Sequence, residues 1–152
     1  MATVVDLIAN LRSLNLKQVA EEVISRHTGE FTEFNKQQLS EGKSPDGGRI
    51  GQYAYNKGKY ARYKNALNPK PGLGFVDLIL TGAFRQAFAT VFKNDSFFTD
   101  SSDEKSDKLQ SKYGPEHIFG LTDEHKESYS ETIILPDFQG VITSRTGLTF
   151  NQ

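Results

Sequence analysis

The chain of 152 residues contains no cysteine. Without thiols it can form neither a disulfide scaffold nor a zinc or iron–sulfur site with cysteine ligands, and it has no cysteine nucleophile. Long hydrophobic runs are lacking too: the longest, Phe75–Leu80, is broken by Asp77 and is far too short to span a bilayer. The first residues lack the basic region that begins a signal peptide. We therefore expect a soluble protein that makes no membrane contact.

Length and composition favour one globular domain. A compact chain of this size buries about 68–70% of the surface that its unfolded form exposes, so it needs neither a metal nor a disulfide to fold. Tryptophan is absent, and 11 phenylalanines and 6 tyrosines supply all the aromatic rings. We expect a single domain over residues 1–142 that contains a long loop at 49–74, followed by a polar C-terminal tail at 143–152.

Apolar residues at helical spacing predict one or two long helices over residues 3–41. The first stripe consists of Val4, Leu7, Ile8, Leu11 and Leu14, and the second of Leu16, Val19, Ala20, Val23 and Ile24. We interpret both stripes as core residues. Glycine, proline and aspartate predict a turn over residues 42–48. Residues 49–74 show no periodicity, and we expect there a loop with one helical turn at 59–64.

The middle of the chain predicts a small antiparallel sheet. Phe75–Leu80 reads as a strand that Thr81 and Gly82 close. Residues 83–92 fit the face of a helix or of a strand equally well. Asn94 and Asp95 then offer a turn, and residues 96–99 a short strand partner.

Helices are expected again towards the C-terminus. Ser102 can cap a helix over residues 103–113, and Thr122 can cap the last helix, each with two acids in the first turn. Pro136 should kink or split that last helix because proline removes a backbone donor. The predicted fold class is therefore α+β, with a long N-terminal helix or helix pair and C-terminal helices packed on one small antiparallel sheet.

Charge is distributed unevenly along the chain, although its net value is only −1. Lys36–Lys70 carries a net charge of +6, whereas Asp95–Glu131 carries −6. These segments are either two solvated surfaces or opposite faces that attract a second copy head to tail, an arrangement that closes into rings. On the second interpretation the candidate interface residues are Tyr53, Tyr55, Lys57, Lys59, Tyr60, Arg62, Asp103, Glu104 and Asp107.

The stretch 53–64 also admits another partner. Alternating aromatic rings and cations can stack on bases and neutralise phosphates, so a nucleic-acid-binding module is the first alternative. The same residue types are enriched at protein interfaces. Composition does not separate the two partners.

Catalytic motifs are missing. The histidines His27, His117 and His125 have no metal-ligand spacing, and the chain contains no GxSxG, Walker or GxGxxG motif. The acids around Asp100–Asp107 could in principle bind a divalent cation, but acids at a helix start explain them better. We expect no enzyme, catalytic residue, metal or other cofactor. A metal-dependent hydrolase that uses Asp100, Asp103 and Glu104 is the second alternative.

The order of short motifs points to a family. The motifs are Asn35-Lys-Gln-Gln38-Leu39-Ser-Glu-Gly42, Asp46-Gly47-Gly-Arg-Ile50-Gly51-Gln-Tyr53, Tyr60-Ala-Arg-Tyr-Lys64, Leu80-Thr81-Gly82-Ala-Phe84, Asp103-Glu-Lys105, Leu109, Tyr113-Gly114 and Ile118-Phe-Gly-Leu-Thr-Asp-Glu124. Over about two-thirds of its length the chain thus resembles small structural proteins of tailed bacteriophages and prophages, especially those of Bacteroidetes hosts. It is similar to the wider group of virion-morphogenesis, tail-completion and head–tail connector proteins. Two departures are Tyr53, where the group has tryptophan, and the reduced C-terminal motif Leu135-Pro136-Asp-Phe138.

The resemblance implies a non-enzymatic virion protein that forms an oligomeric ring in the neck or tail and joins head to tail. It implies six or twelve copies, contacts with adjacent portal, neck or tail proteins, and assembly in the host cytoplasm. The shared residues have structural roles. Gly42 and Gly47 bracket a loop with unusual backbone angles, and Gly120 allows close packing before the last helix. Thr81 and Gly82 mark a tight turn that brings Phe84 onto the core.

Overall fold

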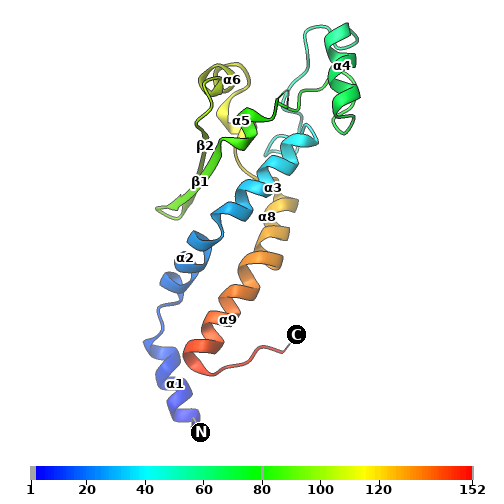
Figure 1. Ribbon diagram of the computed structural model, residues 1–152. Coiled ribbons are helices and arrows are strands. Elements are labelled where there is room, and N and C mark those ends of the chain that lie inside the picture. Colours follow the sequence, from blue (N-terminus) through cyan, green and yellow to red (C-terminus); the bar gives the residue numbers. More distant parts are fainter. Residues whose placement is uncertain (1–2, 80, 152) are drawn as a thin grey trace.

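The computed structural model describes residues 3–79 and 81–151 and confirms the α+β class. Figure 1 shows an elongated molecule in which α2 and α3 run beside α8 and α9. The N-terminal helix α1 and the C-terminal segment lie at one end, and α4, α6 and the β-hairpin lie towards the other. We call the α1, α2, α8 and α9 end the stem, and residues 42–120 the head.

The N-terminal region forms three helices rather than one or two: α1 (Val4–Ser13), α2 (Leu16–Arg26) and α3 (Thr28–Ser40). The first break arises because the Asn15 side chain accepts a hydrogen bond from the Gln18 amide at 3.1 Å and starts a new helix. The interpretation of both apolar stripes as core is wrong for α1, which contains no buried residue. It holds for Val19 and Val23 of α2, which are fully buried.

The C-terminal helix is continuous but changes from α-helical to π-helical and back. Thr122 caps α8 (Asp123–Tyr129) as predicted, and the π-helical turn η1 (Ser130–Ile134) leads into α9 (Leu135–Thr146). The helix is not split at Pro136; instead the π-helical turn ends two residues before this proline, which has no backbone N–H to donate. The helix extends into the segment expected as a polar tail and ends at Thr146, which is buried.

The sheet is a two-stranded antiparallel hairpin. Strands β1 (Phe88–Lys93) and β2 (Ser96–Ser101) pair with Val91 opposite Phe98. The predicted turn is confirmed, because Asn94 and Asp95 both have positive φ (51° and 58°), as a tight hairpin turn requires. The ambiguous stretch 83–92 contains both structures, since the short helix α5 (Ala83–Gln86) precedes β1.

The strand predicted at Phe75–Leu80 is wrong for the described residues, and Leu80 lies outside them. Residues 76–79 are irregular. Asp77 accepts a hydrogen bond from the Ile79 amide at 2.9 Å, and Leu78 adopts φ 57°. A left-handed residue cannot continue an extended ladder, so the buried aspartate turns the chain here.

The loop at 49–74 is more ordered than its composition suggests. It contains the helix α4 (Lys59–Leu67), longer than the single turn expected, and an isolated bridge joins Gln52 to Phe75. Helix α6 (Ser106–Tyr113) begins later than predicted, because Ser102 does not cap it and a turn at residues 103–105 comes first. Pro115 begins the short helix α7 (Pro115–Ile118).

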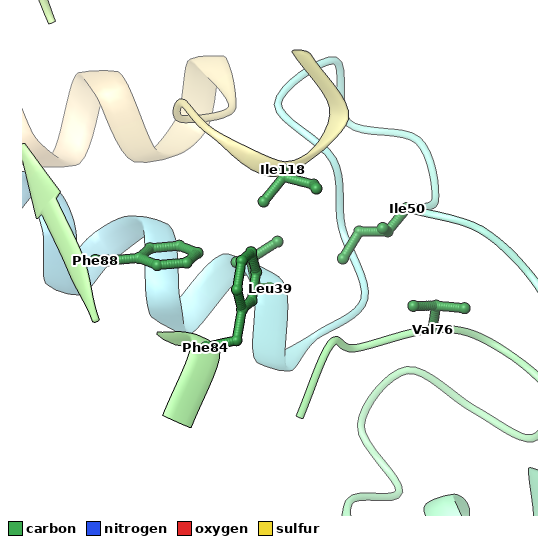
Figure 2. Close-up of a cluster of buried hydrophobic side chains, with 6 residues drawn as sticks. All are labelled: Leu39, Ile50, Val76, Phe84, Phe88 and Ile118. Atoms are coloured by element: carbon green, nitrogen blue, oxygen red, sulfur yellow. The ribbon is translucent and has the colours of Figure 1, made fainter. Parts of the chain in front are cut away.

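The core lies where α3 meets the head. Figure 2 shows its six buried side chains, Leu39, Ile50, Val76, Phe84, Phe88 and Ile118. A second cluster of Phe31, Leu121 and Tyr129 joins α3 to the last helix. Gly42 and Gly47 have positive φ, which confirms the unusual backbone angles expected of them, and Gly82 and Gly120 have positive φ as well. Gly82, next to Thr81, precedes α5 and directs Phe84 into the core, as predicted.

Candidate functional site

A cleft opens in the head between α4, the irregular segment 76–79, the start of α5 and α6. Its volume is about 170 Å³. The lining is largely apolar, with three tyrosines at its wall; the main side chains are Tyr53, Tyr60, Tyr113, Leu78, Phe84, Leu109 and Asp103. The cleft therefore joins residues from both oppositely charged segments of the sequence within one subunit.

Two tyrosines of the cleft pack against each other. The rings of Tyr53 and Tyr60 meet edge to face, with centroids 5.1 Å apart. Burial, and then the nearby charge of Asp77, raises the pKa of both phenols. Both therefore stay neutral at physiological pH and offer hydroxyl groups rather than a negative charge.

A buried ion pair underlies the cleft. The Nζ of Lys64 lies 2.8 Å from Oδ1 of Asp77, and the two side chains are only 5% and 2% exposed. The Asn68 side-chain amide donates to Oδ2 of Asp77 at 3.0 Å. The carboxylate is thus fully satisfied, and the pair fixes α4 to the segment after it. Sequence reasoning missed this pair; the only sign of it was an aspartate inside an apolar run.

The candidate interface residues separate into two groups. Tyr53 and Asp103 are half-buried and line the cleft, and Oδ1 of Asp103 accepts from the Lys105 amide at 2.9 Å. The others are exposed: Tyr55, Lys57, Lys59, Tyr60, Arg62, Glu104 and Asp107. Whether they form an interface stays a prediction.

The exposed cations of the α4 region have no acidic neighbour in sequence. Between Tyr53 and Lys70 there is no Asp or Glu. Among the described residues, Lys57, Lys59 and Arg62 form no ion pair. We call these three residues the basic stripe. It can attract a negatively charged partner at little desolvation cost.

The segment that leads into and forms α6 has no net charge, because residues 103–113 hold three acids and three lysines. By contrast Asp123–Ile134, which spans α8 and η1, holds four acids and one lysine. Glu124, Glu127 and Glu131 are exposed there, and we call them the acidic stripe.

An apolar surface lies on α1. The helix is well formed, because Thr3 and Asp6 make reciprocal hydrogen bonds of a capping box at 2.8 and 3.2 Å. Yet Val4 is 71% exposed, Val5 74% and Ile8 44%. The helix presents side chains that its own subunit does not bury.

The acids of the hydrolase alternative do not converge on a metal. Within residues 3–79 and 81–151, no group of three or more His, Asp or Glu side chains is arranged so that it could hold a metal ion. Oδ1 of Asp100 instead accepts from the Gln110 side chain at 3.0 Å. The geometry gives this alternative no support.

The histidines have structural surroundings. His27 joins Glu30 and Asp137 at 2.9 and 2.8 Å, linking the α2–α3 junction to α9. These hydrogen bonds to Glu30 and Asp137 raise the pKa of His27. His125 lies 3.2 Å from Oε1 of Gln38. His117 lies farther from its acids, at 3.9 Å from Asp46 and 3.7 Å from Glu116.

Across the part of the chain that the structure describes, no helix combines the length and apolar character needed to cross a membrane. Comparisons with protein-family models, with curated proteins and with solved structures found no match.

Proposed function

We propose that this chain is a non-enzymatic structural subunit of a tailed-phage particle that self-associates as a ring in the neck or tail and joins head to tail. Helix α1 is the observation that carries self-association. It is capped and amphipathic, but none of its residues is buried in the subunit. The motif order that resembles virion-morphogenesis and connector proteins supports the phage assignment.

The physical basis is the cost of exposed apolar surface. Val4, Val5 and Ile8 present adjacent aliphatic side chains to solvent at one end of an elongated molecule. Burial of such side chains contributes about 25 cal/mol per Å² of apolar area. A neighbouring copy in a ring that covers α1 with an apolar surface of its own removes both surfaces from water.

The test combines solution mass and particle composition. Light scattering should show an oligomer for the wild-type chain, and Ile8→Asp should shift the population towards the monomer. Asn10→Asp is the matched control, since it adds the same charge on another face of α1. Mass spectrometry of purified particles should detect the chain. A wild-type chain that is monomeric and absent from particles would refute the proposal.

A second candidate function is nucleic-acid binding by the α4 region, as weighed from the sequence. The observation that favours it is the exposure of Lys57, Lys59 and Arg62 beside Tyr55, which is 84% exposed. Retardation of labelled DNA at low salt, weakened steeply by added salt, would support it.

A further inference from the structure

We propose that the basic stripe on and before α4 binds the acidic stripe of α8 and η1 on a second copy of this chain, so that subunits associate head to tail. This rests on the proposed self-association and names the surfaces that make it. Two features point to a second copy as the occupant of each stripe: the opposite charges of the two stripes and their separate positions on the subunit.

The basic side is free to bind. Lys57 lies two residues before α4, Lys59 is the first residue of α4, and Arg62 follows within the first turn. All three are exposed. The fourth cation of the stretch, Lys64, is buried against Asp77 and does not contribute to the surface. The buried pair instead holds the helix that carries the stripe in a fixed position.

The acidic side is an ordered helical face. Glu124 and Glu127 are three residues apart and Glu131 is four residues further, so they follow one side of the helix. Asp123 already pairs with Lys126 at 3.3 Å, which leaves the three glutamates outside that pair. Within the described ranges these glutamates form no ion pair. Glu124 does exert a favourable charge effect on Lys43.

The two stripes do not meet within one subunit. Figure 1 shows α4 set apart at one end of the molecule, whereas α8 lies farther along, beside α3. Helix α6, which also lines the cleft, holds one acid and two lysines and offers no acidic face. Two different surfaces that match each other and cannot pair internally define a heterologous contact, which closes into a ring when the rotation permits.

A second copy explains the stripes better than nucleic acid does. Two of the tyrosines that could stack on bases, Tyr53 and Tyr60, pack on each other at the cleft. The acidic stripe would have no role in binding nucleic acid, because its carboxylates repel phosphates. A second copy uses both stripes at once. Individual exposed ion pairs are weak, so the contact needs several acting together.

The experiment exchanges the charges. Variant A carries Lys57→Glu, Lys59→Glu and Arg62→Glu, and variant B carries Glu124→Lys, Glu127→Lys and Glu131→Lys. Sedimentation should show self-association weakened about tenfold or more in each variant alone. A mixture of A and B should recover it, since each variant then meets opposite charge on its neighbour. Association of the wild type should also weaken as salt rises.

The control keeps the charge change and moves it. Lys93→Glu, Lys105→Glu and Lys108→Glu alter the same net charge at exposed positions outside the basic stripe. This variant should self-associate as the wild type does. Circular dichroism and thermal unfolding check that all variants fold.

The outcomes separate the surface from the function. If variant A associates like the wild type while Ile8→Asp does not, the stripe contact is wrong and self-association through α1 stands. If the wild type is monomeric at every concentration, both proposals fail. If the monomer binds labelled DNA through the basic stripe, the stripe belongs to nucleic acid and this inference is overturned.

Discussion

The head and the stem of this molecule are stabilised by different interactions. Where α3 meets the head, six buried apolar side chains from distant parts of the sequence pack together, and within the head Lys64 and Asp77 form an ion pair shielded from solvent. Asn35 and Gln38 of α3 add buried hydrogen bonds to the backbone of residues 118–122. Packing and buried polar bonds therefore fix the head.

The stem is stabilised more by ion pairs at its surface. Arg26 pairs with Asp137 at 2.9 Å, and Arg145 with Glu22 at 2.7 Å, all at least partly exposed. Its buried apolar residues are few, and α1 has none. The difference teaches that pH and salt should act mainly on the stem, whereas substitutions in the core should act mainly on the head.

The largest expected effect comes from breaking the buried pair in the head. Lys64→Ala leaves the Asp77 carboxylate buried without its cation, so the free energy of unfolding should fall by about 3–5 kcal/mol. Urea unfolding measures this change. The exposed residue Lys108 is the control, and Lys108→Ala should change stability by about 0.5 kcal/mol at most. Equal effects at the two lysines would mean that the head does not depend on its buried pair.

A pair of glycines tests the backbone of the head against that of α3. Gly82 has φ 84°, so Gly82→Val should lower the free energy of unfolding by about 1–2 kcal/mol through backbone strain. A clash of the Cβ does not add to this cost, because a Cβ there meets no atom closer than 3.6 Å. Gly29 lies in α3 with open space around it, and Gly29→Ala should stabilise by about 0.5–1 kcal/mol. Melting temperatures should shift in opposite directions. An unchanged melting temperature for Gly82→Val would show that the turn at residue 82 adjusts to the larger side chain.

The His27 link between α2, α3 and α9 should make the stem sensitive to pH. Its raised pKa means that the stabilisation is fully present below pH 6.5 and is lost as pH rises through the higher folded value. Glu30 has a lowered pKa, so its share is lost as pH falls below 4.5. Arg26 and Asp137 are the other charged groups in this contact.

His27→Gln should therefore destabilise by about 1 kcal/mol between pH 4.5 and 6.5 and have little effect at high pH. Urea unfolding at several pH values measures it, and hydrogen exchange should place the change in α2 and α9. A loss that is the same at all pH values would assign His27 a packing role only.

The smallest expected effect is at the exposed rim of the stem. Glu22→Gln should cost about 0–1 kcal/mol, because the ion pair with Arg145 is exposed and screened by salt. Thermal unfolding at low and high salt checks it, with Arg145→Gln as the reciprocal variant. A loss that persists unchanged at high salt would count against an electrostatic origin.

Local chemistry made several features predictable. The Thr122 cap and the turn at Asn94 and Asp95 depend on residues close in sequence, and the structure has both. The strand at Phe75–Leu80 was not predictable in this way. Its apolar pattern is real, but a buried contact from Asp77 to α4 overrides it.

The candidate surfaces show the same limit. The sequence indicated the basic stretch at 53–64 but not that Lys64 points inward while Lys57, Lys59 and Arg62 stay exposed. It also indicated an acidic segment without showing that Glu124, Glu127 and Glu131 lie exposed along one helix. Which charges reach the surface depends on packing between distant segments.

By itself the sequence determined the α+β class, the Thr122 cap and the positive φ of Gly42 and Gly47; the cap and the glycine angles follow from interactions within a few residues. Only the tertiary structure decided that the apolar stripe of α1 stays exposed and that Tyr53 and Asp103 share a cleft. A periodic pattern shows that a helix has an apolar face, but what covers that face is set by long-range packing. The apolar face of α1 therefore stays exposed in the subunit, because no distant segment of the described chain buries it.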